Sequence, residues 1–147
     1  MNAKTYLRQI KWCEIKIDQR KIQLHSMGGN YTYIQGLDYS RDRVQTSPQD
    51  AMAEKVVREL SRMEKRRNEI LQLIAGFEDL RNKIINQIQG MDRAEHGQLL
   101  FKIYVEHKDL LIVSREMGYA YQSIANMHGQ ALQAFAAKYL DNEKPLE

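Results

Sequence analysis

Cysteine, proline and long apolar runs are all scarce in this 147-residue chain. The single cysteine, Cys13, excludes an intramolecular disulfide and any zinc site built from several cysteines. Only two prolines leave room for long uninterrupted helices. The longest strictly apolar stretch, Leu110–Val113, is far shorter than the roughly 20 residues of a membrane-spanning helix, and the amino terminus lacks the apolar core of a signal peptide. We therefore expect a small cytoplasmic protein, not a secreted scaffold, a transporter or a large enzyme.

Recognisable catalytic and ligand-binding motifs are also lacking. The four histidines share no metal-ligand spacing with carboxylates, and the chain has no HExxH, P-loop or GxGxxG sequence. Cys13 falls on an apolar helical stripe, where a small buried side chain is the usual role. We predict no catalytic residues, no metal site and no cofactor.

Excess positive charge is confined to one part of the chain. The 22 Lys/Arg and 19 Asp/Glu residues give a net charge of +3. Residues 1–91 carry +5, whereas 92–141 and 142–147 carry −1 each. A basic cluster in the first part consists of Arg58, Arg62, Lys65, Arg66 and Arg67. Glutamates stand three or four residues from these side chains, so the cluster is read either as a solvated face or as charge for a nucleic-acid partner.

Two long helices are expected in residues 1–90. Apolar or small residues recur every three or four positions from Ala3 to Met27, and the glycine pair at 28–29 is a typical helix end. Residues 28–47, which contain Tyr31, Tyr33 and Tyr39, are interpreted as a long connection whose tyrosines either anchor it or stack on a partner. Ser47-Pro48 marks a new helix start, and a heptad-like stripe then continues to about Gln89.

The heptad-like stripe predicts a long helical hairpin resembling a coiled coil. A helix of this length cannot bury its stripe alone, so it must pack against the first helix, a second copy of the chain, or both. A homodimer through the long helices is one of these alternatives. Arg67 and Arg81 interrupt the stripe. In coiled coils, polar residues at such positions set the register of the helices or the choice of partner.

Residues 91–141 are expected to form a separate helical bundle, followed by a frayed tail at 142–147. Asp92 and Glu95 fit a capping box that starts a helix ending near Glu106, and Asp109 fits the cap of a short helix that ends at Met117. A further helix from Ala120 to about Leu140 follows.

Two helices that meet at a sharp turn need a small contact residue, a glycine and a compact apolar residue. The chain supplies them as Ser114, Gly118 and Ile124, with Val113, Met117 and Met127 filling the interior. This spacing predicts a helix-turn-helix, and an ordinary helical hairpin with a glycine cap is the alternative.

The stretch LLFKIYVEHKDLLIVSREMGYAYQSIANMHGQALQAF resembles region 4 of bacterial sigma factors. More closely, the chain is similar to a phage and prophage family of small proteins related to the ArpU- and RinA-type late transcriptional regulators. That similarity covers AKTYLRQIKWCEIKI, DRVQTSPQDAMAEKVVREL and GYAYQSIANMHGQAL. It implies a phage-encoded DNA-binding regulator of transcription, with the helix from Ala120 in the major groove. The chain departs from the family where a serine usually caps this helix, since Ala120 stands there, and where a basic residue usually stands, now Asn126.

The surface expected to read bases follows from this placement. It consists of Tyr121, Gln122, Ala125, Asn126, Gly129 and Gln130. Glutamine and asparagine can pair bidentately with adenine, and alanine or tyrosine can meet a thymine methyl group. The candidate phosphate contacts are Lys108, Arg115 and His128.

Because no Lys or Arg lies between Arg115 and Lys138, the recognition helix itself is neutral. Either the basic face of the first 91 residues supplies charge for double-stranded DNA, or the module docks on host RNA polymerase or its sigma factor instead. A small terminase subunit, which joins a helix-turn-helix to oligomerising helices, is a third hypothesis.

Overall fold

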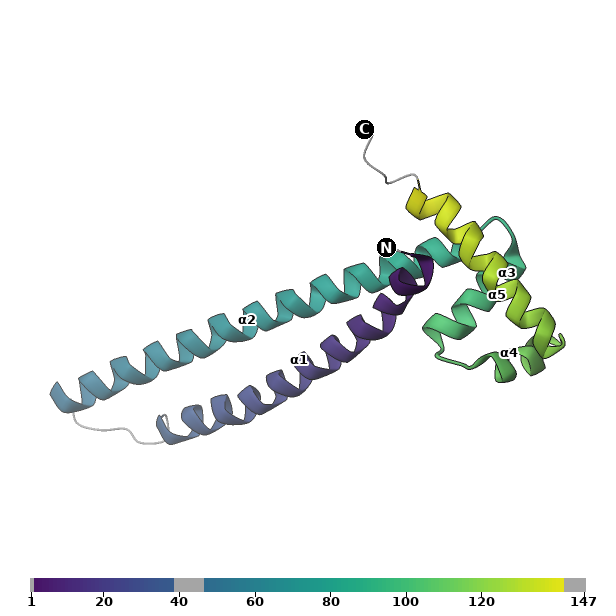
Figure 1. Cartoon of the computed structure of the whole chain (residues 1–147). Helices are drawn as coiled ribbons and strands as arrows, with labels where there is room; N and C mark the ends of the chain where they lie inside the picture. Colours follow the sequence, from purple (N-terminus) through teal and green to yellow (C-terminus); the bar gives the residue numbers. More distant parts are fainter. Residues whose placement is uncertain (1, 39–46, 142–147) are drawn as a thin grey trace. The chain divides into compact units, whose positions relative to one another are not determined.

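The computed structural model describes residues 2–38 and 47–141 of the chain, with side chains described for 2–27 and 50–141. Helices are the regular secondary structure of these residues, with no strand among them, so the predicted all-α class is confirmed (Figure 1). The elements are α1 (Ala3–Asp38), α2 (Ser47–Gln89), α3 (Ala94–Leu100), the π-helix η1 (Phe101–Val105), α4 (Leu110–Met117), α5 (Tyr121–Phe135) and the π-helix η2 (Ala136–Leu140).

Helix α1 is longer than the sequence pattern indicated. The expected end at Gly28-Gly29 was wrong, because the helix continues to Asp38. Glycine inside a helix costs only about 1 kcal/mol relative to alanine, so a glycine pair permits a helix end without imposing one. Helix α2 begins at Ser47, as predicted. The tyrosine side chains at 31, 33 and 39 lie outside the described residues.

The chain divides into two compact units, which we describe separately. Unit 1 comprises Met1–Ile15 and Glu78–Glu147, and unit 2 comprises Lys16–Phe77. Unit 1 contains residues on both sides of position 90, where the sequence pattern predicts a domain boundary. The physical reason is that Ile84 and Ile88, near the end of α2, share a core with Leu99 and Leu100.

Unit 1 holds a well-packed apolar core. The first turns of α1 and the last turns of α2 pack with α3, α4 and α5 around twelve buried residues: Ala3, Leu7, Ile10, Ile84, Ile88, Leu99, Leu100, Tyr104, Val113, Ile124, Ala131 and Phe135. The ring of Phe135 lies 5.8 Å from that of Tyr6 and 4.9 Å from that of Tyr139, measured between centroids. Leu7 is fully buried.

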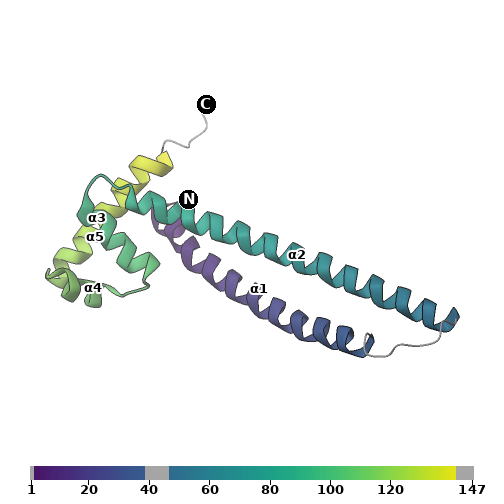
Figure 2. The same ribbon diagram turned by 180° about the vertical axis from the view of Figure 1, so that it is seen from behind.

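Unit 2 is a pair of helical segments with a small contact cluster. Its parts of α1 and α2 run alongside each other in opposite directions (Figures 1 and 2). The cluster consists of buried Ile17, Ile70 and Ile74, with half-buried Leu24, Met27 and Phe77 packed against them. Arg67, on the same stripe, is exposed.

One local expectation for residues 91–106 is wrong, and the helix expected to end near Glu106 is present to Val105. The capping box at Asp92–Glu95 was wrong: Arg93 occupies the cap position of α3 without a side-chain hydrogen bond, while Asp92 pairs with Lys138 at 2.8 Å. The helix that follows changes at Phe101 from an α-helix to the π-helix η1.

None of the helices in the described parts of the chain is long and apolar enough to cross a bilayer.

Candidate nucleic-acid interface

The start of α4 is fixed by a side-chain cap. Asp109 has extended backbone angles, and its carboxylate accepts a hydrogen bond of 2.8 Å from the backbone N–H of Ile112. This bond satisfies one of the backbone donors that the first turn of a helix leaves unpaired. The cap predicted at Asp109 and the helix predicted over Leu110–Met117 are both confirmed.

The turn after α4 depends on Gly118. This residue has φ +75° and ψ 26°, the left-handed conformation in which a Cβ atom is unfavourable. The backbone N–H of Tyr119 donates to the carbonyl oxygen of Ser114 at 3.0 Å, which completes the hydrogen bonding of the helix end. No atom lies within 4 Å of the place a Cβ would take, so the requirement for glycine is conformational and not steric.

The residues expected in the interior lie where α4 meets α5. Val113 and Ile124 are fully buried, and Ser114 is 4% exposed. The Ser114 hydroxyl donates to the carbonyl oxygen of Leu111 at 2.7 Å, so this buried polar group is satisfied within α4. Met117 and Met127 are half-buried and pack against the same core. Gly118 itself is exposed at the turn.

The outer face of α5 presents polar groups to solvent. The members of the predicted base-reading set that are exposed are Tyr121, Gln122, Asn126, Gly129 and Gln130, while Ala125 is half-buried. The Gln122 amide donates to the Asn126 side-chain oxygen at 3.3 Å. Ala120 caps α5 without a side-chain hydrogen bond, as the sequence indicated. This face therefore holds amide groups in register one helical turn apart.

The three candidate phosphate contacts differ in their surroundings. Lys108 is held between Glu116, at 2.6 Å, and Glu106, at 2.7 Å, and these hydrogen-bonded carboxylates raise the pKa of the lysine. Glu116 also pairs with Lys102 at 3.0 Å. Arg115 is exposed. One carboxylate, that of Glu116, thus offsets much of the positive charge beside the turn.

His128 does not extend into solvent from α5. Its Nε2 atom lies 2.9 Å from the hydroxyl of Tyr104, and the two rings are 5.8 Å apart between centroids. Burial, and secondarily the nearby charge of Lys4, lowers the pKa of His128. The imidazole is therefore neutral at pH 7 and acts as a hydrogen-bonding partner without a charge of its own.

A basic face on α1 was missed by the sequence reading. Lys4, Arg8 and Lys11 line a cavity of about 360 Å³ in unit 1 together with His107, Lys108 and His128. The signal was available, because positions 4, 8 and 11 follow the spacing of one helix face. The pattern is masked by the apolar stripe of the same helix, and the denser basic cluster at 58–67 is the more conspicuous one in the sequence. That cluster lies in unit 2, where Arg62 is paired with Glu59 at 2.7 Å.

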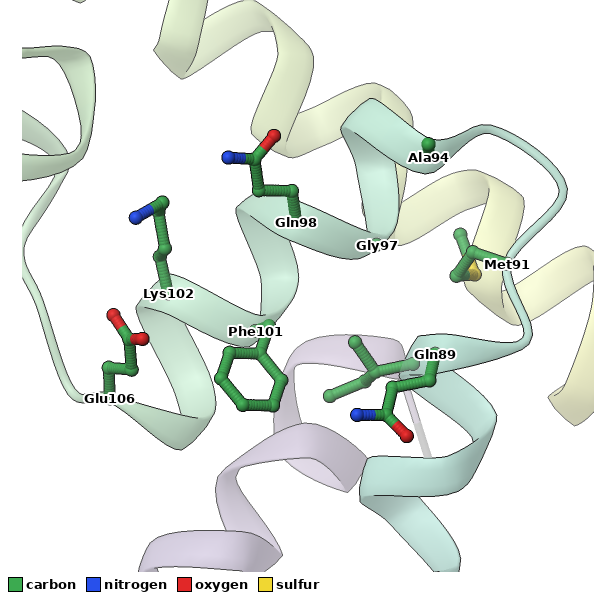
Figure 3. A pocket seen from close by; sticks show the side chains of 9 residues that line it. Gln89, Met91, Ala94, Gly97, Gln98, Phe101, Lys102 and Glu106 are labelled. Carbon is green, nitrogen blue, oxygen red and sulfur yellow. The ribbon is translucent and has the colours of Figure 1, made fainter. Parts of the chain in front are cut away.

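A second cavity, of about 440 Å³, lies elsewhere in unit 1 (Figure 3). Gln89, Met91 and Phe101 give it apolar and amide surfaces. Its charged lining residues are Lys102 and Glu106, which pair with Glu116 and Lys108. Such a lining offers apolar packing and amide hydrogen bonds to a ligand.

The described ranges contain no group of three His, Cys, Asp or Glu side chains placed to hold a metal ion. No family model, no curated protein and no solved structure matches the chain.

Proposed function

We propose that α4, the turn at Gly118 and α5 form a helix-turn-helix through which this protein binds double-stranded DNA. The observation that carries the proposal is the left-handed Gly118 between two short helices whose inner faces are buried through Val113 and Ile124. In this arrangement the second helix presents its first turns to the major groove. The segments of α1 and α2 act as a helical hairpin, and a homodimer through the long helices is part of the proposal.

Base readout is assigned to the amides of α5. Gln122 and Asn126 are exposed and one turn apart, and each can form a bidentate pair with an adenine edge. Tyr121 and Ala125 supply apolar contacts for thymine methyl groups, and Gly129 and Gln130 continue the same surface. The similarity to phage late regulators of the ArpU and RinA type, noted from the sequence, supports a role in transcription in the cytoplasm of a bacterial host.

A second candidate function is docking on protein. Large apolar side chains lie exposed at the start of α4 and just after Gly118: Leu111 is 47% exposed, Ile112 44%, Tyr119 40% and Tyr121 51%. A DNA-binding face is normally rich in cations, whereas this one is apolar and amide-bearing. Host RNA polymerase or its sigma factor would be the partner under this hypothesis. A small terminase subunit remains a third hypothesis, and light scattering separates its large rings from a monomer or dimer.

The test is fluorescence anisotropy with phage promoter DNA and a scrambled duplex over a salt series. We expect tighter binding to the promoter, and we expect the double variant Gln122→Ala/Asn126→Ala to lose about 1–3 kcal/mol of discrimination for each lost contact. The matched control is Asn68→Ala/Gln72→Ala, an exposed amide pair at the same spacing on α2.

Two results would decide against specific readout. One is equal affinity for both duplexes at every salt concentration. The other is an equal loss of discrimination in the double variant and its control. Recovery of RNA polymerase or sigma factor from nuclease-treated host lysate, lost on Leu111→Ser, would favour the protein-docking function.

A further inference from the structure

The basic cavity of unit 1 combines two walls of different character. One wall is the first two turns of α1, which contribute Lys4, Arg8 and Lys11. The other wall comes from η1, the residues that lead into α4, and one residue of α5. It consists of Ile103, Tyr104, His107, Lys108, Asp109 and His128. The cavity is therefore built next to the start of α4, within the same compact unit.

The α1 wall carries uncompensated positive charge. Lys4, Arg8 and Lys11 are exposed, and no ion pair involves them within the described part of the chain. Their fields reach the opposite wall: Lys4 acts on His128, and Arg8 opposes the rise that burial causes in the pKa of Tyr104. The three cations thus face the cavity as a group.

The opposite wall adds hydrogen-bonding groups, and two of its basic members already have carboxylate partners: His107 Nε2 lies 2.6 Å from the Glu14 carboxylate, and Lys108 pairs with Glu106 and Glu116. Tyr104 and His128 contribute a hydroxyl and an imidazole that already lie 2.9 Å apart. The single carboxylate of the lining belongs to Asp109 and is engaged in capping α4. Three cations beside neutral donors form a setting suited to an anion with several oxygens, and phosphate oxygens are the usual acceptors for such lysines and arginines.

We propose that this cavity binds a backbone phosphate of the DNA that α5 reads, with Lys4, Arg8 and Lys11 as its cationic ligands. The inference rests on the proposed function and deepens it. It supplies the charge that the neutral α5 lacks, because phosphate neutralisation provides much of the affinity of DNA-binding proteins. The contact belongs to α1, so α1 is part of the DNA-binding surface of unit 1.

The experiment compares two triple variants of the full-length chain. Lys4→Gln/Arg8→Gln/Lys11→Gln removes the α1 cations. The control, Lys55→Gln/Lys65→Gln/Arg66→Gln, removes two lysines and one arginine that are exposed on α2. Both variants have the same net charge, so a difference between them reports position and not total charge.

Anisotropy with promoter and scrambled DNA over a salt series provides the main readout. Each phosphate contact contributes about 0.9 to the slope of log affinity against log salt concentration. Because the cavity holds one phosphate, we expect the α1 variant to lower this slope by about 1 and to weaken binding to both duplexes equally. The α2 control is expected to keep the wild-type slope. Equal slopes in the two variants would overturn the proposal, even if wild-type DNA binding confirms the proposed function.

A phosphate titration separates this site from the proposed function. Pyrophosphate is added while the imidazole NMR signals of His107 and His128 are followed in the wild type and in the α1 variant. If the wild type fails to bind DNA, the proposed function fails. Shifts that vanish in the α1 variant would then establish a site for a free phosphate compound and overturn the assignment to DNA. Absence of shifts together with absence of DNA binding would overturn the site altogether.

Discussion

The two compact units are made from the same two long helices yet bury very different amounts of side chain. In unit 1, the ends of α1 and α2 contribute to a core of twelve buried residues. In unit 2, the described side chains form a cluster with three buried isoleucines, Ile17, Ile70 and Ile74. Apolar side chains there remain open to solvent, such as Ile22 at 68% and Val57 at 56%. Helix length alone therefore does not indicate how much of the stability comes from packing.

The heptad-like stripe of α2 makes this contrast clear within one helix. Ile84 and Ile88 are fully buried, whereas Leu60 and Met63, on the same stripe, are half-exposed. A periodic pattern identifies the face that packs, but the partner determines how deeply it is buried. In unit 1 this partner is a set of three further helices, and in unit 2 it is one segment of α1.

The largest effect is expected from shortening isoleucines in the two units. Ile84→Ala and Ile74→Ala lie ten residues apart on α2 and remove the same atoms. We expect Ile84→Ala to lower the free energy of unfolding by about 4 kcal/mol and Ile74→Ala by about 2 kcal/mol, because the larger core leaves a more confined cavity. Urea unfolding followed by circular dichroism measures both. Equal losses would show that the units are equally well packed.

Glycine substitutions are expected to act with opposite signs in the two units. Gly118→Ala forces a Cβ onto a left-handed residue and should destabilise unit 1 by about 1 kcal/mol or more. Gly76→Ala lies within α2, where nothing approaches within 4 Å, and should stabilise by about 0.5–1 kcal/mol. Thermal unfolding of the two variants gives the signs directly. A neutral Gly118→Ala would argue against a strict turn at this position.

Most helix positions could be predicted from the sequence because their signals are local. Asp109 and Gly118 define α4 through a side-chain cap and a left-handed residue, and both require only neighbouring residues. The glycine pair at 28–29 gave a wrong helix end because glycine can adopt both the helical and the left-handed backbone conformation. Which of the two it adopts depends on residues outside the local sequence. The capping box at Asp92 misled for a related reason: its carboxylate pairs with Lys138, 46 residues away.

The part of the candidate site that lies on one helix could be predicted from the sequence. The part formed by segments far apart in the sequence could not. The exposed face of α5 follows from helical periodicity. The cavity lined by Lys4 and His128 requires the start of α1 to lie against α5, which no local pattern encodes. Pairing of Lys108 with Glu116, eight residues later, likewise depends on the geometry between η1 and α4.

Acidification is expected to weaken unit 1 through His128. Burial lowers its pKa in the folded state below the ordinary value of 6.5, so the unfolded chain takes up a proton first as pH falls. The free energy of unfolding should therefore decrease as pH drops below about 6.5, until the folded imidazole is also protonated. Urea titrations between pH 7.5 and 5 measure the slope, and His128→Gln should reduce it. An unchanged slope in the variant would assign the pH dependence to other groups.

The smallest effect on stability, and the sharpest on electrostatics, is expected from Glu116→Gln. This exposed carboxylate holds Lys102 and Lys108, and those lysines hold its pKa below the ordinary value. Exposed ion pairs contribute little to folding. Removing the carboxylate should leave stability nearly unchanged, free Lys102 from its ion pair and leave Lys108 paired with Glu106 alone. Under the proposed function, the added positive charge raises the affinity for DNA and steepens its salt dependence.

The matched control for this change is Glu59→Gln, which releases Arg62 from an ion pair in unit 2 with the same change in net charge. Anisotropy at several salt concentrations compares the two variants. If Lys102 and Lys108 lie near the bound DNA, only Glu116→Gln tightens binding, because a charge in contact with a phosphate acts far more strongly than one screened over more than about 10 Å. Equal tightening by both variants would mean that DNA responds to the total charge of the chain and not to the surface around α4.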